Sequence, residues 1–451
     1  MLKTVVNIFK IEDLRNKVLF TVALLLIYRL GFHIYIPGFD PQAIASAAGA
    51  RDESSPLGRA ADMMQIFTGG NLDNSSLFGL GIMPYITASI ILMLLGEVLP
   101  SLRKLRQEGQ TGYKKIQEYT RYLTVPICVL QSMIYMRLLG QFTYAGMQTQ
   151  AFIMGVCGMT AGTIFLMWLG EQIDEYGIGN GISLIIMAGI IARMPWAVGQ
   201  LIANVNFDVA APPGSIGPTK ILILIGAFVF VVAGAILITQ GQRRIPVQQA
   251  KMMRGHRMYG GQRHYLPLRV NHGGVMPIIF AAAFMSFLPV AVVQLGRIQA
   301  IAGSTVFFTI QNSLAPHAFT YNLIYMVLIF LFAYFWVTVQ FQPKELAKNL
   351  RDSGSFVPGL RPGPRTAEYL EAVMTRVTYY GATFLAVIAV VPSVVMSLLG
   401  VDWRVATFLG GTGLLIVVSV SLDLVQRIEA SLLMHSYEGF SETGRIKGAY
   451  G

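Results

Sequence analysis

Charged side chains inside long apolar stretches are the residues of this sequence best placed to do chemistry, because a charge at that depth needs water or a partner. The main ones are Arg29, Arg137, Arg193 and Asp423. Three of them, Arg29, Arg137 and Asp423, lie near the ends of their stretches, where a charge can reach the interface. Arg193 lies past the middle of its stretch, so we expect it to face water or a partner inside the protein. So few such charges disfavour an ion-coupled carrier.

Sequence motifs of catalysis are missing from the chain. It contains no GxxxxGK[ST] phosphate loop, no HExxH pair and no GxSxG elbow. The Gly-rich run GIGNGIS, Gly177–Ser183, has no strand before it, which disfavours a nucleotide site. Cys128 and Cys157 fall within apolar stretches and are expected to be reduced, without a disulfide or metal framework. We therefore expect no enzyme, no metal site and no cofactor.

Long apolar stretches are the elements that carry these residues. Of the 451 residues, 54% are hydrophobic and 13% are charged, against about 25% charged in soluble domains. Runs of 18 or more apolar residues recur, which predicts an all-α polytopic membrane protein, since barrel strands would alternate with period two. The first run is too long for a cleavable signal peptide. We expect ten spans, at Val18–Ile36, Leu77–Leu99, Tyr122–Leu139, Ala151–Leu169, Gly181–Ala203, Ile221–Thr239, Gly274–Val293, Tyr321–Val339, Val377–Leu399 and Val405–Val425.

Lysine and arginine are divided unequally between the connecting segments. An even number of spans puts both termini on one side, and the segments on that side hold 26 of the 34 Lys and Arg residues. The positive-inside rule then predicts that both termini are cytoplasmic. Two segments on this side are long, basic loops: Gly241–Gly273, which has two β-like stretches and should form a hairpin, and Gln342–Arg376, where Pro/Gly pairs should hold Arg361 on a stiff, extended tip. Positive-inside bias or anionic lipid explains the charge alone, whereas the length also suits an acidic partner such as ribosomal RNA.

The external segment Pro37–Ser76 contains a short, weakly apolar piece, Leu57–Thr68, closed by Gly69 and Gly70. Twelve helical residues reach about 18 Å, well short of the roughly 30 Å hydrocarbon core. The piece therefore lies on the outer surface or folds back into the protein. Taken alone, the pattern favours the surface helix.

One sequence pattern occurs twice. GIMPYITASI begins at Gly81 and GVMPIIFAAA begins at Gly274, an offset of 193 residues. Each copy opens an apolar run, and its early Pro is expected to free a backbone carbonyl that then needs an internal partner. Chance is the alternative explanation; a true repeat predicts two related halves with a working site where they meet.

Ten motifs follow one another along nearly the whole chain. They are YRLGFHIYIPGFD (Tyr28–Asp40), FTGGNL (Phe67–Leu72), LGIMPYITASII (Leu80–Ile91), EYTRYLT (Glu118–Thr124), GIGNGISLII (Gly177–Ile186), QRRIPVQQAK (Gln242–Lys251), LPLRVNHGGVMPIIFA (Leu266–Ala281), FVPGLRPG (Phe356–Gly363), YLEAVMTRVTYYGA (Tyr369–Ala382) and LGGTGLLIVV (Leu409–Val418). In these motifs and their order the chain resembles the SecY family, the large subunits of the bacterial Sec protein-conducting channel. The resemblance favours a true internal repeat.

The resemblance implies ten transmembrane helices in two pseudo-symmetric inverted halves, helices 1–5 and 6–10, around an hourglass pore. The segments it implies are a cytosolic N-terminus at 1–17, an N-terminal half at 18–203, an external hinge at 204–220, a C-terminal half at 221–425 with basic cytosolic loops at 241–273 and 342–376, and a cytosolic tail at 426–451.

Three sets of site residues are carried over from the family to matching positions. A re-entrant plug at about 57–70, in place of the surface helix, would use Leu57, Met63, Met64, Ile66, Phe67, Gly69 and Gly70. A lateral gate between Leu77–Leu99 and Gly274–Val293 would use Pro84, Thr87, Ile91, Pro277, Phe280 and Phe284. An aliphatic pore ring would use Ile82, Ile86, Ile186, Ile190, Ile279 and Ile416. The pairs Ile82/Ile86 and Ile186/Ile190 are each spaced i,i+4, so each shares one helix face. Arg193 departs from the small or apolar residues usual there in the family.

The resemblance also implies what the channel does and with whom. It would conduct unfolded secretory proteins across the bacterial plasma membrane and release transmembrane segments sideways into lipid. Small subunits resembling SecE and SecG, the motor ATPase SecA, the ribosome, signal peptides and nascent chains would be its partners, with no DNA. Arg243, Arg244, Arg257 and Arg361 are the candidate docking residues for SecA or ribosomal RNA. A secondary transporter with inverted repeats is the alternative; it would need midplane charges, which are scarce here.

Overall fold

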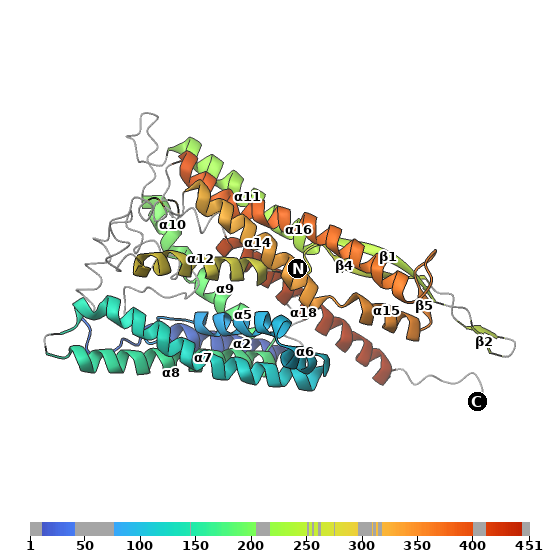
Figure 1. Cartoon of the computed structure of the whole chain (residues 1–451), viewed down its shortest axis with the longest axis horizontal. Coiled ribbons are helices and arrows are strands. Elements are labelled where there is room, and N and C mark those ends of the chain that lie inside the picture. Colours follow the sequence, from blue (N-terminus) through green and yellow to red (C-terminus); the bar gives the residue numbers. More distant parts are fainter. Residues whose placement is uncertain are drawn as a thin grey trace. The chain divides into compact units, whose positions relative to one another are not determined.

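The computed structural model describes residues 11–40, 76–144, 146–203, 217–249, 252–254, 257–259, 263–274, 276–295, 309, 313, 318–399 and 412–443. The predicted plug, 57–70, and most of the predicted hinge, 204–220, lie outside these residues. The described chain is mostly helical, as predicted (Figure 1). It divides into two compact units, Met1–Pro195 with Val420–Gly451, and Trp196–Ser419.

The first unit is a helical bundle. Its elements are α2 (Glu12–Gly31), α5 (Met83–Val98), α6 (Pro100–Gln107), α7 (Gln110–Leu139), η2 (Gly140–Phe142), α8 (Gln148–Tyr176), α9 (Gly181–Ile191) and the part of α18 (Thr412–Thr443) from Val420 onward. Helices α7 and α8 pack closely because Gly155 leaves room for Met136, whose sulfur would lie 2.1 Å from an added Cβ. Buried Cys128 belongs to the same core, whereas Cys157 is exposed, and both thiols are free.

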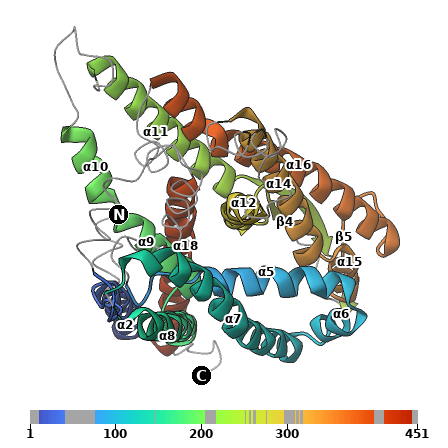
Figure 2. The same cartoon turned by 60° about the vertical axis from the view of Figure 1, so that its left-hand side comes forward.

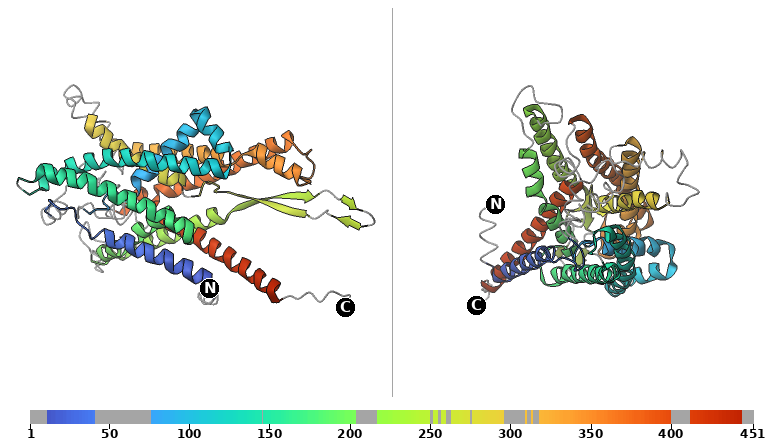
Figure 3. Two further views of the ribbon diagram at one scale, coloured as in Figure 1. Left: turned by 90° about the horizontal axis from the view of Figure 1, so that it is seen from below. Right: turned by 90° about the vertical axis from the view of Figure 1, so that its left-hand side faces the viewer.

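The second unit combines helices with a small sheet. It contains α10 (Met194–Ala203) from Trp196 onward, α11 (Pro218–Gln240), β1 (Gln242–Gln249), β2 (Met252–Arg254), β3 (Arg257–Tyr259), β4 (Arg263–Arg269), α12 (Met276–Leu295), α14 (Phe319–Gln340), α15 (Pro343–Asp352), β5 (Ser355–Phe356), α16 (Pro364–Leu399) and the first residues of α18. Strands β1 and β4 pair antiparallel, Gln242 opposite Arg269, and run as a long ribbon (Figure 3). The hairpin predicted for Gly241–Gly273 is therefore confirmed.

The base of this ribbon is packed, not free. Ile245 and Leu268, on paired strands, are buried in one cluster with Leu370 and Met374 of α16. Strand β5 adds to the other edge of β1, with Phe356 opposite Gln248. The sheet thus ties the two basic loops together in one unit.

Among the described residues, four helices are long and apolar enough to cross a membrane, within Gln148–Tyr176, Pro218–Gln240, Phe319–Asp352 and Pro364–Val391. A fifth span is possible if α5 and α6 count as one, bent by 102° at the Leu99–Pro100 junction (Figure 2). Shorter apolar helices occupy Gly181–Ile191 and Met276–Met285. Ten spans are consistent with this set.

The predicted span Gly181–Ala203 consists of two helices rather than one. Helix α9 ends at Ile191 and α10 begins at Met194. Pro195 explains the break, because its ring has no N–H to bond the carbonyl of Ile191, whereas Pro is tolerated in the first turn of a new helix such as α10. Arg193 lies in this break, where its amide donates to the Ile190 carbonyl at 3.2 Å. The Arg193 side chain is half-buried, and the group that it faces stays a prediction.

Candidate functional site: the apolar ring and its supports

The start of α5 carries the first ring residues. Gly81 adopts a positive φ of 55°, which glycine tolerates without the Cβ clash of other residues. Ile82 is the N-cap and Pro84 the second residue of α5, where its missing N–H would have no helical partner anyway. The expectation that this Pro frees a helical carbonyl is therefore wrong. Ile86 N donates to Ile82 O at 3.2 Å, so the i,i+4 spacing is realised.

Helix α12 in the second unit begins in the same way, with a glycine of positive φ followed by an early proline. Gly274 has a φ of 59° and Pro277 is the second residue of the helix. Ile279 follows one turn into α12, at the position that Ile86 holds in α5. The repeated pattern therefore has a repeated local structure.

All six ring residues are buried, each with an exposed fraction of 5% or less. Ile82 and Ile86 lie on α5, and Ile186 and Ile190 on α9, all in the first unit. Ile279 on α12 and Ile416 on α18 belong to the second unit. Side chains that face lipid lie exposed on the surface of the protein, and these six do not. Their meeting in one ring stays a prediction.

The candidate gate residues are divided by burial. On α5, Pro84 is buried, Thr87 is half-buried with its hydroxyl bonded to Met83 O at 3.0 Å, and Ile91 is exposed. On α12, Pro277 is buried. Phe280 is 4% exposed and Phe284 is 50% exposed. The Phe280 ring packs against two aromatic rings of α14, Phe332 and Trp336.

Three of the candidate docking arginines can be placed with their side chains. Arg243 and Arg244 are exposed on β1, and Arg361 is exposed five residues after the end of β5, which pairs with β1. For Arg257 only the β3 backbone is described. The prediction of a stiff, extended tip around Arg361 is wrong. The segment around Arg361 contains tight turns at Gly359 and Gly363, with φ of 86° and 123°. The Thr366 hydroxyl closes them by donating to Arg361 O at 2.9 Å.

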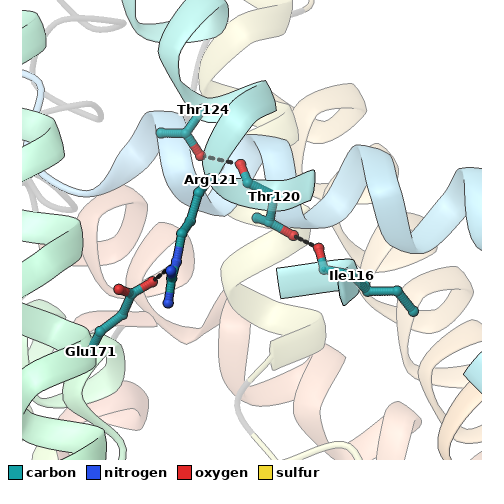
Figure 4. A network of polar contacts seen from close by, with 5 residues as sticks. All are labelled: Ile116, Thr120, Arg121, Thr124 and Glu171. Atoms are coloured by element: carbon teal, nitrogen blue, oxygen red, sulfur yellow. Dashed lines mark hydrogen bonds and ion pairs between the residues drawn. The ribbon is translucent and has the colours of Figure 1, made fainter. Parts of the chain in front are cut away.

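Sequence reasoning missed an ion pair between α7 and α8. Arg121 Nε donates to Glu171 Oε1 at 2.6 Å, with Thr120 and Thr124 bonded to the carbonyls one turn before them (Figure 4). Glu171 is 14% exposed and Arg121 is 44% exposed. The EYTRYLT motif contained Arg121, but nothing in the sequence paired it with a residue fifty positions away.

Apolar spans, a bent apolar helix pair and buried aliphatic residues on four helices are typical of a polytopic membrane protein. Solved structures share the fold: one described as a protein conducting channel matches 94% of each chain with a TM-score of 0.62 at 19% identity. Another, on a SecY plug domain that stabilises the closed state, matches 94% of each chain with a TM-score of 0.60 at 19% identity. At that identity the likeness concerns the fold alone.

The chain belongs to the SecY family. The SecY family model matches residues 76–425. The protein translocase subunit SecY of Thermotoga maritima is 40% identical over 447 residues, covering 98% of each chain. That of Corynebacterium glutamicum is 40% identical and covers 97% of this chain and 99% of its own. That of Streptomyces coelicolor is 41% identical and covers 98% of this chain and all of its own. The family consists of channel subunits and not of enzymes. Because its members are channels, the alternative of a secondary transporter is not favoured.

Proposed function

We propose that the chain is the central pore-forming subunit of a Sec translocon in a bacterial plasma membrane. It conducts unfolded secretory proteins across the bilayer and releases transmembrane segments sideways into lipid. The observation that carries this proposal is the burial of all six ring residues in a chain about 40% identical to translocase subunits over its whole length. Both termini are proposed to be cytoplasmic, on the side that holds 26 of the 34 Lys and Arg residues.

The ring is proposed to seal the channel and still let a polymer through. A narrow apolar constriction dewets, so it blocks ions when no chain is present. Aliphatic side chains change rotamer around a passing chain without recognising one sequence. A polar side chain at the same place would hydrate the leak path. The plug at about 57–70 would close the idle pore on its external side.

The lateral gate is proposed to lie between α5 and α12, the two helices that begin with the repeated Gly and Pro. A signal peptide would enter between them, and a transmembrane segment would leave by the same route. The exposed side chains of Ile91 and Phe284 are those able to touch such a segment. Buried Pro84, Pro277 and Phe280 would support the helices from inside each unit.

Energy is proposed to come from partners on the cytoplasmic side. Arg243, Arg244, Arg257 and Arg361 would contact SecA or ribosomal RNA, since phosphate groups bind clustered cations. The pairing of β1 with β5 brings the two basic loops into one unit, which supports a shared docking surface. A structural relative at a TM-score of 0.56 is an idle yeast complex bound to the yeast 80S ribosome. Small subunits resembling SecE and SecG would hold the two halves together.

Site-specific crosslinking of a stalled secretory chain tests the pore. Crosslinkers at Ile82, Ile86, Ile186 and Ile279 are expected to label the stalled chain. Crosslinkers at Leu222 and Val327, which are exposed on α11 and α14, serve as controls and should label lipid instead. Labelling from the control positions with none from the ring positions would overturn the proposal.

A further inference from the structure

The GIGNGIS turn, between α8 and α9, is held by side chains from two other places in the first unit. Ile178 N donates to Thr21 Oγ1 of α2 at 3.1 Å, across 157 residues of sequence. Gly181 N donates to Asp174 Oδ1 of α8 at 2.7 Å. Ser183 N donates to the side-chain oxygen of Asn180, the N-cap of α9, at 2.9 Å. We call Thr21, Asp174 and Asn180 the latch.

The glycines of the turn make this latch possible. An added Cβ on Gly177 would lie 2.6 Å from Thr21 Oγ1, and one on Gly181 would lie 2.0 Å from the carbonyl oxygen of Gly170. Gly179 has a φ of 102°, a backbone conformation that side chains rarely adopt. Only glycine therefore lets α2 and α8 come so close to the amides at the start of α9.

The sequence of helix α9 does not by itself fix the rotation of the helix about its own axis, so contacts with other elements must do so. It has eleven residues, GISLIIMAGII, about 16 Å of helix. Apolar residues surround its whole circumference, so no amphipathic stripe specifies which face turns inward. In a membrane, lipid and protein interior are similarly apolar, so hydrophobic burial does not decide the rotation either. Directional contacts must therefore do so: the hydrogen bonds at its first turn and, further along, the Ser421 hydroxyl of α18, which donates to Met187 Sδ at 3.5 Å. A thioether sulfur is a weak acceptor, so the first-turn bonds are the stronger of the two.

The rotation matters because Ile186 and Ile190 share one face of α9. One residue corresponds to about 100° of rotation, so a slip of one position would turn both side chains away from where they now point. The latch holds the first turn of α9, which begins five residues before Ile186. Two amides of this turn are bonded: that of Gly181 to Asp174 of α8, and that of Ser183 to the N-cap Asn180.

We propose that Thr21 and Asp174 are positioning residues of the channel's seal: they fix the rotation of α9 and so the direction of Ile186 and Ile190. This inference rests on the proposed role of those two isoleucines in the pore ring. It assigns a purpose to GIGNGIS that the proposed conduction path itself does not require.

The test is the ion conductance of the idle, purified translocon in planar bilayers. Thr21→Val keeps the volume but removes the acceptor of Ile178 N, and Asp174→Ala removes that of Gly181 N. Their double variant is expected to raise idle conductance about tenfold, since two hydrogen bonds of ordinary strength are lost. Thr21→Ser and Asp174→Asn keep an acceptor oxygen and should conduct like the wild type.

Thr120→Val is the matched control. Thr120, like Thr21, is 5% exposed and its hydroxyl donates to the carbonyl four residues before it at 2.9 Å. Thr120 does not belong to the latch, so Thr120→Val should leave the conductance unchanged. If Thr120→Val leaks as much as Thr21→Val, the latch inference is overturned, because loss of any buried hydroxyl would suffice.

A second readout separates positioning from mere stability. Ile186→Cys, in a Cys128→Ala, Cys157→Ala background, should react at a changed rate with a water-soluble maleimide when the latch is removed. If the double latch variant unfolds earlier but keeps wild-type conductance and maleimide rate, the inference is wrong. If the double variant fails to fold, the conductance of Thr21→Val alone tests the inference.

Ile186→Asn tests the proposed ring itself. If Ile186→Asn does not raise the idle conductance, the proposed function is contradicted. If Ile186→Asn raises it but the latch variants do not, only this inference is contradicted.

Discussion

Gly81 and Gly274 adopt the same left-handed backbone, with φ of 55° and 59°, each two residues before the first residue of α5 or α12. They lie 193 positions apart in the sequence and in different units. Each is followed by a Pro as the second residue of its helix. The repeated sequence therefore encodes a repeated turn and helix start, one for each proposed gate helix.

Replacing Gly274 is expected to destabilise the channel through backbone strain alone. Among the residues that the structure describes, no atom lies within 4 Å of an added Cβ there, so Gly274→Ala should cost about 1–2 kcal/mol from the left-handed conformation. Gly274→Asn should cost less, because Asn tolerates this region better. Gly226→Ala, within α11 and equally without a described atom near an added Cβ, should be neutral or stabilising. Thermal unfolding in detergent measures all three, and an equal loss for Gly226→Ala would contradict the argument.

Charge reversal at the two basic loops is expected to uncouple the channel from its motor. Arg243→Glu with Arg361→Glu reverses two exposed charges in one sheet-linked unit. Translocation driven by SecA into vesicles should fall at least about tenfold, with a weaker dependence on salt than in the wild type. The double change to Lys keeps both charges and is the control. Wild-type translocation by the Glu variant would show that the docking assignment is wrong.

The ion pair between Arg121 and Glu171 is expected to contribute modestly to the packing of α7 on α8. Because Arg121 is 44% exposed, water screens it, and Arg121→Ala should cost about 1 kcal/mol. A double-mutant cycle with Glu171→Gln should show a coupling that weakens in high salt. An additive cycle would mean that the two side chains act independently.

His272, just before α12, is expected to make the second unit sensitive to acid. Burial, and next the charge of Arg269, lower the pKa of His272, and its ring packs edge-on against Phe341. Below the ordinary value of about 6.5, the unfolded chain binds a proton that the folded chain resists. Stability should therefore fall as the pH falls from there through the lowered pKa. His272→Gln should flatten this dependence in unfolding measured between pH 7 and about pH 5.

Two phenylalanines one turn apart are expected to differ in what they touch. Phe284 is 50% exposed and Phe280 is 4% exposed. A photoreactive phenylalanine analogue at 284 should crosslink to a signal peptide during engagement, whereas one at 280 should crosslink within the chain, to α14. A signal peptide captured at 280 but not at 284 would mean that α12 presents another face to the gate.

Much of the fold was predictable because apolar length is a strong physical signal. Helix α11, Pro218–Gln240, extends the predicted span Ile221–Thr239 by only a few residues, and α14 matches Tyr321–Val339 as well. Helix boundaries were predictable only where the helix ends at the same residue as the apolar run. Helix α16 begins at Pro364 rather than Val377, because its polar first turns continue as helix outside the predicted span. Helix α5 begins at Met83 rather than Leu77, because apolar residues also form the turn before it.

The sequence by itself determined the class of protein, the repeated helix starts, the basic hairpin and the family. These depend on composition, on glycine and proline, and on motifs that are local in the chain. Only the tertiary structure decided that Thr21 binds the amide of Ile178, that Arg121 pairs with Glu171 and that Phe280 is buried while Phe284 is exposed. Such contacts join residues far apart in sequence or select one face of an apolar helix. An evenly apolar helix carries no pattern that would reveal either.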